Sequence, residues 1–248
     1  MLSTAATLGV QARPCPQFGL LTRNEWPESW FRAKERLEAL NDPCISYEAC
    51  ETLCREALDY QFGAVCVHGS RVEVAATFLE GAGQHLAAVV GFPLWATCPD
   101  VKAYEARACL AAGASELDVV VNLGWVKDGQ WGRIGAELDL LREAADGSCL
   151  KLILETCYLE NKEKRLACIL ARDAGWDYVK TSTGFGTGGA SLSDVALMRE
   201  SAGAGVKIKA SGGIRDYQTA MDYLQAGVSR IGTSSGPAIV MGEKQSTT

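Results

Sequence analysis

Three charged residues stand within apolar, β-branched runs of the sequence. Asp118 lies in ELDVVVN (116–122), Lys180 ends the run DYVK, and Lys209 lies in GVKIKAS (205–211). A buried charge is costly unless it is paired or serves a reaction. Taken singly, a lysine at a strand end is commonly a solvated rim residue, and an aspartate in a strand is commonly a structural hydrogen-bond acceptor. Two lysines and one acid together suit Schiff-base chemistry.

A lysine attacks a carbonyl group only when its amine is uncharged. With an ordinary pKa of about 10.4, about 1 lysine in 2,000 is uncharged at pH 7. A second ammonium ~6 Å away, at an effective dielectric near 20, disfavours the charged form by roughly 2 to 3 kcal/mol. This lowers the pKa by about two units and raises the uncharged fraction about a hundredfold. We therefore expect one lysine to form an imine, the other to keep it uncharged, and Asp118 to transfer protons.

Glycine-rich segments follow three of the apolar runs. GFGTGG (184–189), GGIR (212–215) and GTSSG (232–236) place small residues where backbone N–H groups can approach an anion. Ser234 and Ser235 add hydroxyl donors. These features indicate a phosphate site, although each loop taken alone is equally well explained by tight turns.

Two further features of these loops bear on the kind of ligand. Pro237 is suited to open a short helix, whose N-terminus favours phosphate. GFGTGG also fits the GxGxxG pattern of dinucleotide-binding proteins, but Lys209 stands where an acidic residue is expected about 20 positions further on. The sequence therefore favours a phosphate site over a dinucleotide site.

These residues need a scaffold that brings several strand ends together, and the sequence supplies a repeated strand–helix pattern. Each strand candidate is apolar on both faces, as in parallel strands covered on both sides. The spacing leaves room for one crossover helix between successive strands. The seven candidates are residues 63–68, 86–92, 116–122, 150–156, 177–182, 205–211 and 228–234.

Eight such units form a (β/α)8 TIM barrel, and 248 residues suit that α/β fold. The eighth strand would come first, near residues 36–41, but RLEALN is a poor strand and is typical of a helix. We therefore predict one barrel domain over residues 41–248, with an atypical or degenerate first strand. Residues 1–40 are predicted to be an N-terminal lead with a helix over 28–40. A doubly wound open sheet is the alternative fold.

The barrel prediction places the charged residues. In residues 116–122, period-two alternation puts Glu116 and Asp118 on one face and Leu117 on the other. Barrel enzymes build their sites at the carboxyl ends of the strands. We therefore expect Asp118, Lys180 and Lys209 to point into one barrel mouth.

Composition excludes several classes of protein. The net charge of −6 argues against a nucleic-acid partner, because a phosphate-backbone binder presents a basic face. The longest apolar runs, such as residues 86–93, fall far short of the roughly 20 residues that span a bilayer, so no membrane partner is expected. The ten cysteines form no CxxC pair, and His68 and His85 are far apart. We expect no metal, no cofactor and reduced cysteines packed as small apolar groups.

The N-terminal residues bear on localisation. Residues 1–24 contain Arg13 and Arg23, several serine, threonine and alanine residues, and no acid. Organellar transit peptides share this bias, and a lead without structure is the alternative. We expect a cytoplasmic protein.

The motifs GFPLW, ELDVVVN, LILETC, DYVKTSTGFGTGG, VKIKASGGIR and SRIGTSSG, in this order, closely resemble those of the deoxyribose-phosphate aldolase family. The resemblance runs from about Gly63 to Val240. It implies a (β/α)8 barrel and a class I, metal-free aldolase. Such an enzyme interconverts 2-deoxy-D-ribose 5-phosphate with acetaldehyde and glyceraldehyde 3-phosphate through a lysine Schiff base.

The resemblance also implies residue roles. Lys180 matches the Schiff-base lysine, Lys209 the lysine that perturbs it, and Asp118 the proton-relay acid. Cys66, in AVCV, matches a cysteine that lies near the substrate aldehyde in some members and is not essential. Family members are often dimers, so a homodimer is expected. The positions that match phosphate-binding residues are Gly184, Gly212, Gly213, Ser234 and Ser235, with Arg215 as a further candidate.

Two positions depart from the family pattern. The family's first strand reads like IDHTLLKP, with an aspartate and a threonine that contribute to the polar network, whereas this chain has RLEALND before Pro43. This difference indicates a variant strand, a displaced N-terminus or a damaged catalyst. Lys207 lies where the family usually has an apolar residue, and we predict that it pairs with Glu116, one step below Asp118.

The sequence therefore predicts a lyase that cleaves 2-deoxy-D-ribose 5-phosphate, with a small phosphorylated sugar as its partner. Two alternatives stay open. One is another class I aldolase with a different donor. The other is a barrel that binds a sugar phosphate without turnover, as regulator or scaffold, which the atypical first strand motivates.

Overall fold

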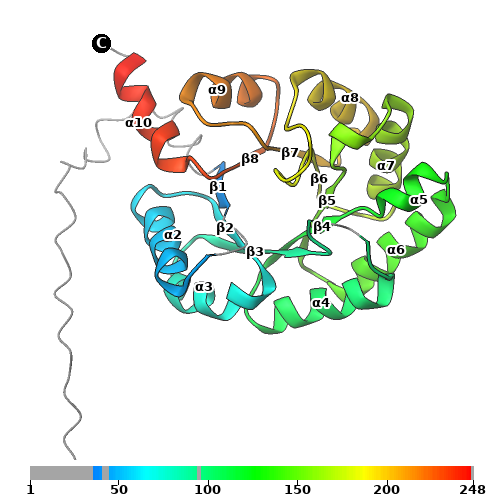
Figure 1. Ribbon diagram of the computed structural model, residues 1–248, viewed down its shortest axis with the longest axis horizontal. Helices are drawn as coiled ribbons and strands as arrows, with labels where there is room; N and C mark the ends of the chain where they lie inside the picture. Colours follow the sequence, from blue (N-terminus) through cyan, green and yellow to red (C-terminus); the bar gives the residue numbers. More distant parts are fainter. Residues whose placement is uncertain (1–35, 41–44, 94–95, 247–248) are drawn as a thin grey trace, which may run out of the picture.

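The computed structural model describes residues 36–40, 45–93 and 96–246. Its eight parallel strands form a closed barrel in chain order, with β8 paired to β1 (Figure 1). This confirms the (β/α)8 barrel, and the doubly wound open sheet is wrong. The strands are β1 (Leu37–Leu40), β2 (Ala64–Val67), β3 (His85–Val90), β4 (Glu116–Val120), β5 (Cys149–Ile153), β6 (Tyr178–Lys180), β7 (Lys207–Ser211) and β8 (Arg230–Thr233).

The helices surround the barrel, as Figure 1 shows, and cover the outer faces of the strands. They are α2 (Tyr47–Asp59), α3 (Val72–Leu79), α4 (Pro99–Ala111), α5 (Leu123–Lys127), α6 (Trp131–Ala144), α7 (Asn161–Asp173), α8 (Leu192–Ala202), α9 (Tyr217–Gln225) and α10 (Gly236–Ser246). Two short 3-10 turns, η2 (Gly69–Arg71) and η3 (Thr156–Tyr158), follow β2 and β5.

The first strand corrects the sequence prediction. Residues 37–40 are extended rather than helical, and they pair on one side with β2 and on the other with β8. The barrel therefore begins before residue 41. The rest of the predicted helix, like residues 1–24, lies outside the described residues.

Barrel closure explains why this segment is extended. Leucine, glutamate and alanine all favour helix when their own propensities decide. Here the neighbouring strands supply hydrogen-bond partners on both sides: Gly63 N donates to Leu37 O at 2.9 Å, and Ile231 N donates to Arg36 O at 2.8 Å. Closing the sheet leaves no unpaired edge at this position, so tertiary pairing overrides local preference.

The two faces of each strand do different things. On β4, Leu117 and Val119 join the apolar core between barrel and helices, while Glu116 and Asp118 point into the barrel. On β1, Leu37 and Ala39 join the same apolar core, while Glu38 points into the barrel. The apolar core thus lies outside the barrel, and the barrel interior carries charge.

Two other expectations can be compared with this fold. Among the described residues, no helix is both long and apolar enough to cross a bilayer. The cysteines of the described part of the chain are free, and several of them pack in the interior. The buried cysteines are Cys50, Cys54, Cys66, Cys109 and Cys168.

Candidate active site

A pocket of about 240 Å³ opens at the carboxyl ends of the strands. Its walls come from the residues at or just after the ends of β2, β3, β6, β7 and β8. The predicted site residues that line it are Lys180, Cys66, Gly184, Gly212, Gly213, Arg215 and Ser234. The structure therefore brings these seven predicted residues together around one pocket.

Asp118 and Lys209 lie next to the pocket rather than in its lining. Lys180 Nζ donates to Asp118 Oδ2 at 2.7 Å, and Lys209 Nζ donates to the same oxygen at 2.6 Å. All three side chains are buried. The structure thus brings the predicted trio together around one carboxylate oxygen.

Strand register explains this meeting. Lys180 at the end of β6 is paired with Lys209 on β7, so both side chains leave the sheet at the same level and on the same face. Asp118 stands on β4 with its side chain inward and reaches across the barrel to both amines. The arrangement depends on the closed barrel, because β4 and β7 are not neighbours in the sheet.

Ser235 is placed differently from its predicted role. It is not among the residues that line the pocket, and its backbone N–H donates to Thr233 Oγ1 at 2.9 Å. Helix α10 begins one residue later, at Gly236, so the predicted helix after the serines is present. The N-terminus of such a helix favours an anion.

Two charged residues of the site were missed by the sequence reasoning. Lys151, on β5, donates from Nζ to Asp118 Oδ1 at 2.7 Å and is fully buried. Glu38, on β1, accepts a hydrogen bond from Lys209 Nζ and is also fully buried. Lys151 could have been found in the same way as Asp118, because it too is a charged residue within an apolar strand. Glu38 was missed because its segment was interpreted as helix.

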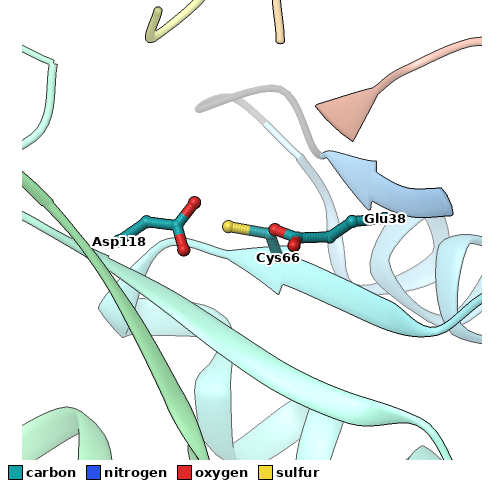
Figure 2. Close-up of side chains that lie close together, drawn as sticks. All are labelled: Glu38, Cys66 and Asp118. Atoms are coloured by element: carbon teal, nitrogen blue, oxygen red, sulfur yellow. The ribbon is translucent and has the colours of Figure 1, made fainter. Parts of the chain in front are cut away.

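Figure 2 shows how Glu38 and Asp118 face each other across the barrel, with the Cys66 side chain between them. Each of the three offers one potential metal-ligand atom, and these atoms lie within 4.8 Å of one another. The carboxylates, however, already bind lysine ammonium groups. Burial raises the pKa of the Cys66 thiol, which therefore stays protonated. The lysines supply the positive charge that a metal ion would bring.

The charge states of Asp118 and Lys209 follow from burial and from their charged contacts. Burial alone would raise the pKa of Asp118, but Lys151, Lys180 and Lys209 outweigh it and hold that pKa well below its ordinary value. Burial alone would lower the pKa of Lys209, but Asp118 and Glu38 outweigh it and raise the pKa. Asp118 is therefore a carboxylate and Lys209 an ammonium at neutral pH.

The predicted ion pair between Lys207 and Glu116 is wrong. Lys207 is exposed at the amino end of β7, where its Nζ lies 5.5 Å from the centroid of the Tyr178 ring. Glu116 Oε2 instead lies 2.6 Å from Lys151 Nζ and 2.7 Å from Arg230 Nη1. Lys207 is too near the strand's solvent end to compete with these buried cations.

Glycine is required where two pocket loops meet. Gly212 and Gly213 have φ values of 87° and 83°, in the left-handed region. A Cβ on Gly189 would lie 2.3 Å from Gly212 O, so the two backbones touch. This close approach leaves the backbone of both loops at the pocket rather than screened by side chains.

An aromatic wall closes one side of the pocket. The rings of Phe92 and Phe185 meet edge to face with centroids 5.6 Å apart, and Lys180 Nζ lies 5.9 Å from the Phe92 centroid. Glu155, buried and with a φ of 42°, anchors the Phe185 loop by accepting hydrogen bonds from Thr183. Apart from Lys180, none of these residues was singled out from the sequence.

A closed (β/α)8 barrel with a buried lysine amine in a pocket at its carboxyl end is the architecture of a barrel enzyme that acts through that amine. The chain belongs to the DeoC/LacD aldolase family, whose model matches residues 32–241. This match includes β1, in agreement with its place in the barrel.

Curated relatives agree with the family assignment. The chain is similar to the deoxyribose-phosphate aldolase of Thermococcus gammatolerans, with 48% identity over 206 residues, which cover 82% of this chain and 92% of that protein. It is 46% identical to the deoxyribose-phosphate aldolase of Brevibacillus brevis over 202 residues, 82% of this chain and 91% of that protein. These findings confirm the resemblance inferred from the motifs.

Solved structures agree as well. The deoxyribose phosphate aldolase of Aeropyrum pernix, described as a tetramer, superposes with a TM-score of 0.80 and 33% identity, covering 86% of this chain and 91% of that one. A structure described as the aldolase QR15 gives a TM-score of 0.81 with 34% identity, covering 87% of this chain and 96% of that one.

Proposed function

We propose that this protein is a lyase that reversibly cleaves 2-deoxy-D-ribose 5-phosphate to acetaldehyde and glyceraldehyde 3-phosphate, through a Schiff base on Lys180. One observation carries the proposal. Lys180 is the lysine whose side chain lines the pocket, and its amine lies beside both the Asp118 carboxylate and the wall of that pocket. The names of the relatives in the family support the choice of substrate.

The geometry supports the choice of Lys180 over the other buried lysines as the proposed nucleophile. Lys209 Nζ is held by Glu38 and Asp118 and does not line the pocket. Lys151 Nζ is likewise held by two carboxylates, at 2.6 and 2.7 Å. Lys180 has one carboxylate partner among the described residues, and it shares that oxygen with Lys209. Lys180 is therefore the lysine of the three that is open to a substrate in the pocket and has the fewest carboxylate contacts.

The reaction begins when Lys180 Nζ attacks the C1 aldehyde of the open-chain sugar. Asp118, at hydrogen-bond distance from Nζ, carries the proton that the nitrogen loses to the new alkoxide, which gives the carbinolamine. A second proton, taken up from solvent through the same carboxylate, lets the carbinolamine hydroxyl leave as water. The product is an iminium ion, with nitrogen doubly bonded to C1 and next to C2, the carbon that becomes the nucleophile of the enamine. Lys209 stays charged throughout and opposes protonation of the Lys180 amine.

The iminium then acts as an electron sink. The C3 hydroxyl loses its proton and becomes the carbonyl of glyceraldehyde 3-phosphate as the C2–C3 bond breaks. The electron pair of that bond forms the C1=C2 double bond of an enamine on Lys180. Protonation of the enamine carbon restores the iminium. Water adds to this iminium, the C–N bond breaks, acetaldehyde leaves, and Lys180 is again a free amine.

The glycine loops are proposed to bind the 5-phosphate. Gly212 and Gly213 bring backbone to the pocket, and Ser234 adds a hydroxyl at its rim. Helix α10 starts just beyond, and its N-terminus favours an anion. Arg215, exposed at the pocket edge, supplies a positive charge. Gly184 completes this side of the pocket.

A donor screen tests the proposal against the other class I aldolases. The purified protein should release acetaldehyde from 2-deoxy-D-ribose 5-phosphate and, in reverse, accept acetaldehyde rather than dihydroxyacetone as donor. Preference for dihydroxyacetone would contradict the proposed substrate. Sugar-phosphate binding in calorimetry without cleavage would favour the binding-only barrel. The main reason for that alternative was a degenerate first strand, whereas β1 closes the barrel and carries Glu38.

The assembly and the location of the protein stay predictions. A homodimer is expected from the family resemblance, while the Aeropyrum pernix protein is described as a tetramer. Light scattering on the purified chain distinguishes these states. A cytoplasmic location is expected, and imaging of the full chain with a C-terminal tag tests it against an organelle.

A further inference from the structure

Six charged side chains in the barrel interior form a closed ring in which cations and anions alternate. We call this set the charge ring. Five strands contribute to it, and each member contacts a member of opposite charge on both sides. Its members, in order, are Arg230, Glu116, Lys151, Asp118, Lys209 and Glu38.

The half of the ring away from the pocket is tightly connected. Arg230 Nη1 lies 2.7 Å from Glu116 Oε2, and the same oxygen lies 2.6 Å from Lys151 Nζ. Lys151 Nζ in turn lies 2.7 Å from Asp118 Oδ1. None of the first three residues lines the pocket.

The half next to the pocket closes the ring. Asp118 Oδ2 lies 2.6 Å from Lys209 Nζ, which also donates a hydrogen bond to Glu38 Oε1. Glu38 Oε2 lies 3.7 Å from Arg230 Nη1, an ion pair without a hydrogen bond. The last contact returns to the first residue of the ring.

The ring is electrically balanced without Lys180. Three cations face three carboxylates, and Lys180 is joined to the ring at one point, an Asp118 oxygen that already binds Lys209. Protonation of Lys180 therefore adds an uncompensated positive charge to a buried set of groups. Such a charge is costly in a protein interior.

Other titratable groups face these residues. On the pocket side, Cys66 from β2, His68 and Arg215 share the pocket with Lys180. On the opposite side, His85 Nδ1 from β3 lies 3.7 Å from Glu116 Oε1, and its side chain is 55% exposed.

Further groups lie near the half of the ring that is away from the pocket. The Tyr178 ring lies 5.9 Å from the Arg230 guanidinium, and Lys207 lies against the same ring at 5.5 Å. The charges of Lys151, Glu116 and Arg230 also act on the half-buried Cys149 thiol. None of these groups adds a second carboxylate to Lys180 among the described residues.

We propose that Glu116, Lys151 and Arg230 are positioning residues that act through the rest of the charge ring to keep Lys180 uncharged. They do not touch the pocket, so their effect passes through Asp118. This inference rests on the proposed function for the role of Lys180, and deepens it: the balance of the whole ring, and not the neighbouring lysine alone, sets the state of the nucleophile.

The test measures how fast each lysine is ethylated by acetaldehyde and cyanoborohydride as a function of pH, by peptide mass spectrometry. Only an uncharged amine reacts with the aldehyde, and Lys162, 75% exposed, serves as the internal reference. The readout is the midpoint pH of Lys180 labelling. It requires no turnover of a sugar phosphate.

Two single substitutions should move this midpoint in opposite directions. Lys151→Met removes a ring cation, leaves the ring with net negative charge, and should raise the midpoint by about one pH unit. Glu116→Gln removes a ring anion and should lower it by about one unit. The double substitution restores balance and should bring the midpoint back close to that of the unaltered protein. If these residues had a purely structural role, the two single substitutions would not move the midpoint in opposite directions, and the double substitution would not restore it.

Two controls distinguish an effect of charge balance from a general loss of stability or folding. Glu137→Gln removes another buried carboxylate, which pairs with Lys102 at 3.0 Å between α6 and α4, and should leave the midpoint unchanged. If Lys151→Met does not fold, as circular dichroism will show, Arg230→Met removes a different ring cation and should also raise the midpoint.

The outcomes are distinct. Midpoints that stay fixed, or that move the same way when a ring cation and a ring anion are removed, overturn the inference. A protein whose midpoints follow the predicted pattern but which releases no acetaldehyde from 2-deoxy-D-ribose 5-phosphate supports the charge ring and contradicts the proposed function.

Discussion

The Glu38 carboxylate and the Lys209 ammonium form a buried, hydrogen-bonded ion pair that joins β1 to β7 across 171 positions of the chain. Both side chains are fully buried. The strand that looked degenerate therefore places its single charged residue against one of the two lysines that the sequence predicted to be functional. This contact makes β1 part of the site as well as part of the barrel.

Glu38→Gln should destabilise the protein. It leaves the Lys209 charge with one fewer carboxylate in a dry interior, and breaking a buried pair by removing one partner costs about 3 to 5 kcal/mol. We expect the free energy of unfolding in urea to fall by an amount of this order. Glu38→Asp keeps the charge and should lose less. Equal stability of Glu38→Gln and the unaltered protein would show that the pair does not stabilise the fold.

Lys209→Met should slow turnover and shift its pH dependence. Lys209 is charged at neutral pH, so removing it removes a charge that opposes protonation of Lys180. The acid limb of the kcat profile should move to higher pH by about one unit. Lys207→Met, two residues earlier on the same strand and exposed, is the matched control and should leave the profile unchanged. An unshifted profile in Lys209→Met would count against electrostatic activation.

Asp118 should contribute to stability only above a certain pH. Its pKa is held well below the ordinary value of about 3.9, so the carboxylate stabilises the folded state above about pH 4. As pH falls through the lower, folded-state pKa, that contribution disappears. We expect Asp118→Asn to be less stable than the unaltered protein at pH 7, with a smaller difference near pH 3. Denaturant unfolding at the two pH values measures this, and a difference that does not shrink would contradict the assignment.

Ser234→Asp should weaken binding of phosphorylated substrates selectively. It places a negative charge at the pocket rim, where the 5-phosphate is proposed to bind. We expect KM for 2-deoxy-D-ribose 5-phosphate to rise at least about tenfold, while the rate with unphosphorylated 2-deoxy-D-ribose changes little. Ser193→Asp, on the exposed first turn of α8, is the matched control. Equal losses with both sugars would place the phosphate elsewhere.

Much of the barrel could be predicted from the sequence because its strands are short, largely apolar runs that recur with room for one helix between them. Period-two alternation placed Asp118 inside the barrel and Leu117 outside, as observed. The meeting of Asp118, Lys180 and Lys209 followed from the barrel geometry alone. The strand β1 was not predicted because its residues favour helix. Only the hydrogen bonds that close the barrel make this segment extended.

The partners of the interior charges could not be predicted, because they depend on which strands face each other across the barrel. Glu116 was expected to meet Lys207, yet it meets Lys151 and Arg230. Strand parity gives the face that a side chain points to, but not its depth or its reach across the interior. Arginine and lysine side chains are long enough to pair with strands that are not their neighbours.

Borohydride trapping tests the central claim most directly. The protein is incubated with 2-deoxy-D-ribose 5-phosphate, reduced, digested and analysed by mass spectrometry, alongside Lys180→Ala. We predict a stable mass addition on the peptide that carries Lys180 and no trapping or turnover in the variant. Addition to Lys209 or Lys151 instead, or full activity in Lys180→Ala, would contradict the account.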